Sequence, residues 1–452
     1  MTDLEHLRRH GLFDAKVPRY TSYPPANKFS SHLNAERPEA WIAAMPAGAE
    51  MSVYVHIPFC RRLCWFCACR TQGTQTDAVL YAYVDTLKAE IAMIRERLPK
   101  DARMARLHLG GGTPTILPPD LLRELMSALE AAFPLAAPAE ISVEIDPTEI
   151  DQDRMDVLMA FGLNRVSIGV QDFDPRVQRA IGREQSLEVT RDTLSALRAM
   201  GVRNVNIDLL YGLPFQDEAS LRATLDDVIA LQPNRIALFG YAHVPWMSKR
   251  QVMIPDDALP TAEQRFALFG AATRRLMSDG YAQIGIDHFA QPGDGLCTAL
   301  EERRLNRNFQ GYTDDGLSYL IGLGASAISR YPQGYIQNHS ATAIYNRAVR
   351  DGHPAWARGC ELSARDSVIA QMIQHILCYA RIEASQIVPS QDMGRAEIEA
   401  ALHDLHGRFA DVTSYRGGIF SITRSGHALS RIIAASLDDT HTFGQGQHSM
   451  AV

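Results

Sequence analysis

From residue 51 onward, short apolar runs rich in branched residues alternate with longer stretches that repeat apolar residues at helical spacing. The short runs predict buried strands, and the amphipathic stretches predict helices. The predicted strands cover residues 51–57, 104–109, 140–145, 164–170, 203–210, 234–241 and 282–286. The predicted helices between them cover residues 77–98, 119–133, 152–161, 187–200, 219–231 and 261–278. Six or seven successive strand–helix units predict a parallel sheet with right-handed crossovers.

The two ends of the chain lack this alternation. Residues 1–48 have no sustained periodicity and include a proline-rich segment, so we expect an extended N-terminal arm. Residues 49–350 then hold the repeated units and an extension. Residues 351–440 predict a small helical domain of winged-helix character, and we expect residues 441–452 to be disordered. Within that small domain, the predicted helices and hairpin cover residues 363–380, 394–406, 426–437 and, for the hairpin, 412–423.

The composition limits the classes of function. The chain has 452 residues, 46% of them hydrophobic, and a formal net charge of −7. An acidic balance argues against a general nucleic-acid binder, which usually carries a basic excess. The N-terminus lacks the basic and apolar regions of a signal peptide, and the longest apolar stretch is too short to span a bilayer. We therefore expect a cytoplasmic protein with no nucleic-acid partner and no membrane span.

Four of the seven cysteines fall within ten residues, in a loop that directly follows the first predicted strand. Three residues separate Cys60 from Cys64, and two separate Cys64 from Cys67. Short cysteine loops bind iron–sulfur clusters through their thiolates. Three thiolates on a four-iron cluster leave one iron without a protein ligand, so the spacing predicts a [4Fe–4S] cluster that can hold an external chelator.

A structural zinc site is the main alternative, because four cysteines can also hold zinc. Zinc sites usually pair two cysteine knuckles across a longer segment, and no second knuckle follows here. Cys69 can be a fourth ligand, a substrate contact or a packed residue. We favour a residue that is not a ligand, because Cys67 and Cys69 are too close in sequence to occupy two corners of a cluster easily.

Polar residues or glycines follow the later predicted strands at one and the same end. The second strand leads into the glycine run 110–112, the third ends at Glu144, the fourth at Gln171 and the fifth at Asp208. Barrels of alternating strands and helices build their active sites at this end. The coincidence therefore favours a partial or complete barrel over an open doubly wound sheet.

Each of these residues also has a structural interpretation. Arg183 can form a bidentate pair with a carboxylate, or it can be a solvated helix residue. For His56, His243 and His288, which lie at or near strand ends, a structural histidine is the default interpretation.

Motifs spread over nearly the whole chain carry a family resemblance. They are PRYTSYP at 18–24, YVHIPFC at 54–60 with Cys69 after it, GVQDF at 169–173, REQ at 183–185, NIDL at 206–209, YGLP at 211–214, RNFQGYT at 307–313 and SAIS at 326–329. In these motifs the chain resembles the bacterial oxygen-independent coproporphyrinogen III oxidases, which are radical S-adenosylmethionine (SAM) enzymes. Ala68 and Arg70 depart from the family's usual glycine and asparagine around the fourth cysteine.

The resemblance implies a fold and a reaction. The fold is of the α/β class, a parallel (β/α) partial barrel of radical SAM type with an N-terminal arm and a small helical C-terminal domain. The reaction is the oxidative decarboxylation of two propionates of coproporphyrinogen III to vinyl groups, which gives protoporphyrinogen IX for haem biosynthesis. A 5′-deoxyadenosyl radical would abstract the hydrogen atom. The implied cofactors are a [4Fe–4S] cluster on Cys60, Cys64 and Cys67 and two SAM molecules.

The resemblance also implies roles for individual residues. Around the cluster-bound SAM it places Tyr54, Gly111, Glu144 and Ile328. Around the second SAM it places Phe66, Gly112, Thr113, Gln171, Arg183, Asp208 and Ala242. Because the substrate carries four carboxylates, we expect contacts from the basic residues Arg19, Arg61, Arg62 or Arg307, with Gln310 and Cys69 as further candidates.

Two related functions stay open. One is a radical SAM haem-trafficking chaperone, and the other is a methyltransferase that modifies tetrapyrroles. Such chaperones generally lack the fourth cysteine and the long arm that are present here. The expected partners are coproporphyrinogen III and an electron donor that the sequence does not identify, and we expect a monomer.

Overall fold

The computed structural model describes residues 3–32, 34, 36–439 and 450–451. The tail predicted at residues 441–452 therefore lies outside the described residues, except for Met450 and Ala451. These two residues run beside the N-terminal arm, where Met450 forms a bridge with Lys16 and the Ala451 amide donates to the Ala15 carbonyl.

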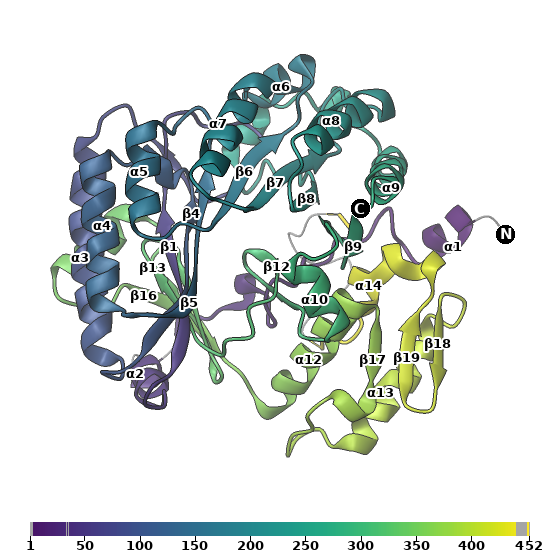
Figure 1. Ribbon diagram of the computed structural model, residues 1–452. Coiled ribbons are helices and arrows are strands. Elements are labelled where there is room, and N and C mark those ends of the chain that lie inside the picture. The colour runs from purple at the N-terminus through teal and green to yellow at the C-terminus, as the bar shows by residue number, and fades with distance from the viewer. Residues whose placement is uncertain (1–2, 33, 35, 440–449, 452) are drawn as a thin grey trace.

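A curved sheet forms the centre of the molecule (Figure 1). Its parallel strands are β1 (Glu50–Ile57), β4 (Arg103–Gly111), β5 (Leu135–Ile145), β6 (Arg165–Gln171), β7 (Asn204–Tyr211), β8 (Arg235–Gly240) and β13 (Leu320–Leu323). Antiparallel strands extend both sides and are β9 (Ala282–Ile284), β10 (His288–Ala290), β14 (Ile328–Tyr331), β15 (Gly334–Asn338) and β16 (Trp356–Glu361).

The strand order is β16-β15-β14-β13-β1-β4-β5-β6-β7-β8-β10-β9. Within the described residues the two outermost strands, β16 and β9, do not pair with each other, so the barrel is partial. The sequence correctly predicts the α/β class and the partial barrel. It does not predict that the run at 282–286 forms β9, a strand antiparallel to its neighbour β10 instead of a seventh parallel unit.

One face of the sheet is covered by helices (Figure 1). They are α3 (Ala78–Arg97), α4 (Pro119–Ala132), α5 (Gln152–Ala160), α6 (Pro175–Ile181), α7 (Leu187–Ala199), α8 (Glu218–Ala230) and α9 (Ala262–Ser278). Five of them begin at a polar cap that accepts from the amide three residues on, and the capping side chains are those of Asp151, Asp174, Ser186, Asp217 and Thr261. The leucines of α4 at positions 122, 125 and 129 recur at helical spacing and are buried.

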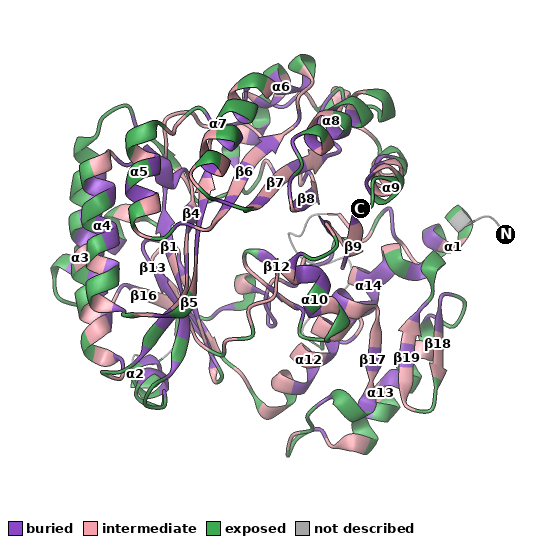
Figure 2. Ribbon diagram, viewed as in Figure 1, coloured by how far each residue is buried: buried purple, intermediate pink, exposed green. Residues whose placement is uncertain are grey.

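The alternation of side chains along each strand separates the core from the polar concave face. In β6 and β7 every second residue is fully buried, and the residues between them are half-buried. The buried set includes Ile168 and Ile207, which belong to the main hydrophobic core. The half-buried set includes Ser167 and Asp208, which point to the opposite, concave side. Figure 2 shows the same contrast across the sheet.

Several elements fall outside the repeated pattern. They are α1 (Asp3–Arg9), α2 (Glu36–Ala43), α10 (Gly295–Glu301), α11 (Thr342–Arg350), β11 (Asn306–Asn308) and β12 (Gly311–Thr313). The N-terminal arm thus contains two short helices that the sequence analysis did not predict. They have seven and eight residues, which is too short to show a clear helical repeat.

The C-terminal region packs beneath the concave side of the sheet (Figure 1). It consists of α12 (Ala364–Tyr379), β17 (Arg381–Glu383), α13 (Arg395–Arg408), β18 (Thr413–Arg416), β19 (Ile419–Ile422) and α14 (Ser430–Ala435). The hairpin β18–β19 lies within the predicted range 412–423 and turns at Gly417 and Gly418, and the three strands form a sheet in the order β17-β19-β18. The hydrophobic core of the C-terminal region also contains Leu12 and Val17, so the N-terminal arm folds as part of this region.

Arg431 of α14 holds the arm and the chain end together. Its guanidinium donates to the backbone carbonyls of Val17 and Pro18 in the arm and to those of Met450 and Ala451 near the C-terminus. These contacts join segments more than 400 residues apart in sequence. No helix in the described part of the chain combines the length and apolar character needed to cross a membrane.

A buried carboxylate links α3 to the second half of the sheet. Glu90 accepts hydrogen bonds from the Tyr345 hydroxyl at 2.7 Å, from the Gly324 amide at 2.7 Å and from the Asn338 amide at 2.6 Å. Burial raises the pKa of Glu90 to about 7 despite these three donors. The cost of removing a donor from so buried an acceptor is the desolvation penalty of the carboxylate.

We expect Tyr345→Phe to lower the free energy of unfolding by about 1–3 kcal/mol, because Glu90 loses a buried donor. The measurement is urea unfolding followed by circular dichroism. Tyr81→Phe is a matched control, since Tyr81 donates to Asp120 at 2.8 Å on the exposed surface, and its cost should stay within about 0.5 kcal/mol. Equal costs for the two variants would contradict the structural role of Glu90.

Candidate active site

The cysteine loop leaves the carboxyl end of β1 at the mouth of the partial barrel. It contains the two-residue strands β2 (Phe59–Cys60) and β3 (Gln72–Gly73), which pair with each other and close the base of the loop. Cys64 is buried, Cys60 and Cys67 are half-buried, and Cys69 is exposed. The three predicted ligands therefore lie on one short loop with closed ends.

A segment that follows β8 supports the far side of this loop. The Ser248 hydroxyl donates to the Cys67 carbonyl at 2.9 Å, and the Gln251 amide donates to the Phe66 carbonyl at 2.7 Å. The same Gln251 amide donates to the carbonyl of Ala242, a residue predicted to contact SAM. Arg250 donates to the Cys69 carbonyl at 3.2 Å. The loop is thus fixed through its backbone, which leaves its sulfur atoms available.

The glycine run after β4 packs directly against the start of the cysteine loop. The Gly112 amide donates to the Ile57 carbonyl at 2.8 Å, and the Thr113 amide donates to the Phe59 carbonyl at 2.9 Å. A Cβ atom on Gly112 would lie 2.5 Å from the Phe59 carbonyl oxygen, and one on Gly111 would lie 2.5 Å from the His56 ring. Only glycine permits so close an approach of two backbones.

Residues predicted to line the cluster-bound SAM meet on the concave face. Glu144 at the end of β5 accepts from the Gly111 amide at 3.0 Å, and its other oxygen lies 3.3 Å from a ring nitrogen of His108. His108 stacks on Tyr54 with ring centroids 5.8 Å apart. Burial alone would raise the pKa of Glu144, but its hydrogen bonds to His108 and Gly111 outweigh burial and lower that pKa. The site therefore holds a carboxylate that is charged at neutral pH.

Arg183 is buried and lies beside the cysteine loop. Its Nη1 is 3.6 Å from the Cys64 sulfur and 3.1 Å from Asp146, while its Nη2 donates to the Gly169 carbonyl at 2.7 Å. Its Nε is buried and has no hydrogen-bond partner in the described residues. The interpretation of Arg183 as a solvated helix residue is therefore wrong, because it follows the end of α6 and points into the site.

The other residues predicted to line SAM occupy the same edge of the sheet. Asp208 on β7 accepts from the side chains of Ser167 and Asn206, and burial raises the pKa of its carboxyl group. Gln171 ends β6 with a φ of 72°, a left-handed conformation that is strained for a residue other than glycine. Ile328 begins β14 and is half-buried.

The cysteine loop has the donor set that an iron–sulfur cluster needs, because it offers three thiols on one short loop. A four-iron cluster spreads its thiolates because each binds a different iron. Arg183 and Thr113 approach the sulfurs of Cys64 and Cys60 at 3.6 and 3.7 Å, as donors to thiolates would. The residues present therefore fit an iron–sulfur cluster.

The protonation of the cysteines differs along the loop. A hydrogen bond from the Cys69 thiol is the largest cause that lowers the pKa of Cys67 to about 6, and Arg250 and Arg183 act in the same direction. Burial raises the pKa of Cys60 to about 11. A bound metal deprotonates its thiol ligands, so occupancy of the loop would override this difference.

The candidate substrate contacts are distributed over different parts of the molecule. Arg61 pairs with Asp77, and Arg62 donates to the Glu184 carbonyl at 2.8 Å, both within the cysteine loop region. Gln310 is exposed at the tip of the β11–β12 hairpin. Arg19 and Arg307 instead line a large cavity. Roles for these residues in substrate binding stay predictions.

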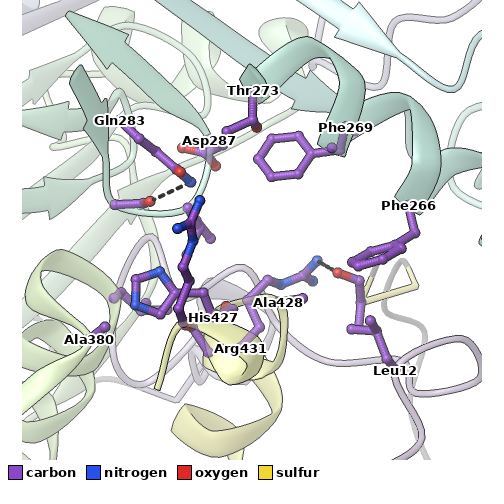
Figure 3. Close-up of a pocket in the computed structure, with 18 of the residues that line it drawn as sticks. Leu12, Phe266, Phe269, Thr273, Gln283, Asp287, Ala380, His427, Ala428 and Arg431 are labelled. Atoms are coloured by element: carbon purple, nitrogen blue, oxygen red, sulfur yellow. Dashed lines mark hydrogen bonds between the residues drawn. The ribbon is translucent and has the colours of Figure 1, made fainter. Parts of the chain in front are cut away.

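That cavity lies between the barrel, the N-terminal arm and the C-terminal region (Figure 3). Its volume is about 1320 Å³, which exceeds the roughly 300–1,000 Å³ of pockets for ordinary small ligands. Tyr211 and Gly240, at the carboxyl ends of β7 and β8, form part of its wall. Arg265 and Arg431 also line it, and the sequence analysis missed both. Neither lies in a recognised motif, so no local signal marked them.

Comparisons with known proteins agree on one family. Residues 54–228 match the Radical SAM superfamily. The chain is 49% identical over 452 residues to the oxygen-independent coproporphyrinogen III oxidase of Paracoccus denitrificans, covering 100% of both chains. It is 47% identical to the protein of the same name from Cereibacter sphaeroides, covering 99% of each chain. Among solved structures, the coproporphyrinogen III oxidase of Escherichia coli, a radical SAM enzyme, is 37% identical with a TM-score of 0.89 and covers 94% of this chain and 98% of its own.

We expect Gly112→Ala to impair cluster assembly, because its Cβ would clash with the backbone that sets the position of Cys60. The measurement is iron and sulfide content per protein after anaerobic reconstitution, with a marked loss expected. Gly407→Ala is the control, since a Cβ on Gly407 in α13 meets nothing within 4 Å. Full iron content in Gly112→Ala would show that the two loops do not need this close contact.

Proposed function

The chain belongs to the family of oxygen-independent coproporphyrinogen III oxidases, and we propose that it oxidatively decarboxylates two propionates of coproporphyrinogen III to vinyl groups. The product would be protoporphyrinogen IX, a precursor of haem. Each vinyl group forms as the propionate loses one hydrogen atom to the 5′-deoxyadenosyl radical, then one CO₂ and one electron, and the electron passes to a separate acceptor. The observation that carries the proposal is the cysteine loop at the mouth of a partial barrel that also walls a cavity large enough for a tetrapyrrole.

The family implies a [4Fe–4S] cluster and SAM as cofactors. Cys60, Cys64 and Cys67 would hold the cluster. When bound, the cluster and SAM supply a 5′-deoxyadenosyl radical that takes a hydrogen atom from the propionate carbon next to the ring. The protein binds and orients the groups that react.

The chain's own side chains have distinct tasks in this scheme. Glu144 is a charged acceptor for the amino or hydroxyl groups of SAM, and His108 and the Gly111 amide fix its orientation. Arg183 places positive charge beside the Cys64 sulfur and would offset the negative charge of the thiolates. Ser248 and Gln251 keep the loop backbone in place. All of these groups lie at the end of the barrel where such folds carry out their chemistry.

We further propose that a second SAM molecule lies beside the first. Phe66, Gly112, Thr113, Gln171, Arg183, Asp208 and Ala242 would line it. Gly112 and Thr113 adjoin the cysteine loop, and Arg183 reaches Cys64, so the two SAM molecules would share one wall of the site. The half-buried Asp208 carboxylate would accept from a ribose or ammonium group of this second molecule.

The setting of the enzyme completes the proposal. Clustered reduced thiols suit a reducing compartment, so we place the protein in the cytoplasm. A monomer is proposed, together with a separate protein or small molecule that donates electrons to the cluster. No observation favours a haem-trafficking chaperone or a methyltransferase over the oxidase.

The decisive experiment is turnover under anaerobic conditions. The reconstituted protein is incubated with reductant, SAM and coproporphyrinogen III, and protoporphyrinogen IX and CO₂ are quantified. Two CO₂ molecules should form for each tetrapyrrole. SAM cleavage with an intact cluster but without vinyl product would reject the oxidase and favour another radical SAM reaction on this fold.

We expect Cys64→Ser to abolish SAM cleavage and to reduce bound iron, because the cluster loses one of its three thiolates. The measurements are 5′-deoxyadenosine formation and iron content. Cys297→Ser is the control, since Cys297 is buried in a separate hydrophobic cluster around α10. Retained SAM cleavage in Cys64→Ser would disprove the ligand assignment.

We expect Asp208→Asn to reduce the SAM stoichiometry from two molecules to one, because the second site loses its charged acceptor. Equilibrium dialysis with labelled SAM, using the reconstituted enzyme, measures the stoichiometry. Asp226→Asn provides a control on the outer helix α8, where Asp226 pairs with Arg275 at 2.6 Å. A wild-type stoichiometry of one would argue against the second site altogether.

A further inference from the structure

Six arginines line the large cavity. Arg274 and Arg424 are exposed and Arg307 pairs with Asp287, which leaves three from distant parts of the chain. Arg19 comes from the N-terminal arm, Arg265 from α9 and Arg431 from α14 of the C-terminal region. Arg19 and Arg265 meet at Gly240, where Arg19 donates to the carbonyl and an added Cβ would lie 3.1 Å from the Arg265 guanidinium. Arg431 donates to the carbonyls of Val17 and Pro18, directly before Arg19. We call Arg19, Arg265 and Arg431 the arginine cluster.

None of the three forms an ion pair in the described part of the chain. Arg19 donates to the Gly240 carbonyl at 2.7 Å, and Arg431 donates only to backbone carbonyls. The Arg265 side chain has no hydrogen bond to a described residue, its Nε is buried without a partner, and its guanidinium lies 5.9 Å from the centroid of the Tyr211 ring. Half-buried guanidinium groups without a carboxylate partner are costly, so a cavity that holds them suits an anionic ligand.

One carboxylate, that of Asp287, faces the arginine cluster, and both of its oxygen atoms already have hydrogen-bond partners in the protein. Asp287 forms a two-pronged pair with Arg307, with distances of 3.2 Å and 3.0 Å, and also accepts from His288 at 2.7 Å. These partners, with Arg307 the largest, overcome burial and hold the pKa of Asp287 well below its usual range. Arg307 is therefore neutralised within the protein, and the charge of the arginine cluster is left for a ligand.

We propose that the arginine cluster binds propionate carboxylates of the tetrapyrrole and so positions it between the barrel and the C-terminal region. This inference rests on the proposed function and names the side of the site that holds the substrate. It shifts the expected carboxylate contacts from Arg61, Arg62 and Arg307 to Arg265 and Arg431, and keeps Arg19.

The position of Arg265 gives the proposal its geometry. Its guanidinium lies over the backbone of Gly212 and Gly240, where added Cβ atoms would come within 3.2 Å of it. Gly212 directly follows β7, the strand that carries Asp208. Gly240 ends β8, the strand that precedes Ala242. A carboxylate held at Arg265 therefore lies at the same edge of the sheet as the predicted SAM residues. A tetrapyrrole can reach from this anchor toward the cysteine loop.

The shape of the cavity fits a flat, partly apolar molecule with charged arms. Figure 3 shows Phe266 and Phe269 of α9 on one wall and His427 and Arg431 on the opposite wall. Apolar rings would pack against a tetrapyrrole, whereas the guanidinium groups would pair with its carboxylates in a bidentate manner. The arginine cluster would then determine which carboxylates of the substrate are anchored. The remaining carboxylates would be presented for reaction.

The test compares binding of coproporphyrin III, the stable oxidised form of the substrate, with binding of its uncharged tetramethyl ester. Both are titrated into the reconstituted enzyme under anaerobic conditions and followed by the porphyrin absorbance. We expect Arg265→Gln to raise the dissociation constant of coproporphyrin III about tenfold or more, because a charge-assisted pair is lost. The dissociation constant of the ester should not change.

Matched variants separate the effect of the charge at Arg265 from the effect of losing a positive charge elsewhere on the protein. Arg275→Gln removes the same charge from the same helix, but Arg275 pairs with Asp226 outside the cavity, so coproporphyrin III binding should be unaffected. Arg265→Lys keeps the charge but loses the planar fork, and it should recover part of the affinity. Added salt should weaken binding of coproporphyrin III by the wild type, but not binding of the ester.

The outcomes distinguish this inference from the proposed function. Unchanged coproporphyrin III affinity in Arg265→Gln, or equal salt sensitivity of acid and ester, would overturn the arginine cluster as the anchor. Weaker SAM binding in Arg265→Gln, with porphyrin binding intact, would also overturn it and assign the site to the SAM carboxylate. If the wild type binds coproporphyrin III through these residues but forms no vinyl product, the proposed reaction fails and the anion site stands.

Discussion

The close contact between two backbones, the glycine run after β4 and the cysteine loop after β1, is the constraint on which the rest of the site depends. Two amide donors, those of Gly112 and Thr113, fix the carbonyls on either side of Pro58. The missing side chains of Gly111 and Gly112 make this possible, because a Cβ would lie 2.5 Å from existing atoms. The position of Cys60 and the orientation of Glu144 both follow from this contact.

Charge is distributed unequally around the site. Arg183 compensates thiolates and Asp146, and Arg307 is held by Asp287, so both are neutralised within the protein. The arginine cluster has no such partner among the described residues. Unpaired guanidinium groups reduce the stability of the free protein, and a ligand that pairs with them recovers that free energy on binding. Stability is thus lower where the substrate is expected to bind.

The C-terminal region and the N-terminal arm act together with the barrel. Residues from the arm, such as Leu12 and Val17, share a hydrophobic core with α12 to α14. Arg431 ties that core to the chain end through four backbone carbonyls. The cavity exists only because this unit faces the barrel, so its walls come from segments with no sequence proximity.

The sequence by itself determined the repeated strand–helix units, because their hydrophobic periodicity is local and each unit has its own caps and glycine turns. The motifs at 54–60, 169–173 and 206–209 likewise marked the strand ends that carry Tyr54, Gln171 and Asp208. Short elements without a full repeat, such as α1, α2 and β14, gave no comparable signal.

Only the tertiary structure decided which charges are satisfied. The sequence does not distinguish the charge of Arg307 from that of Arg265, yet Arg307 is paired with Asp287 and Arg265 has no carboxylate partner among the described residues. The reversal of β9 beside β10 and the cavity under the sheet were also set by contacts between distant segments. The pairing of a buried charge depends on what the fold brings within about 4 Å, and local sequence does not encode that distance.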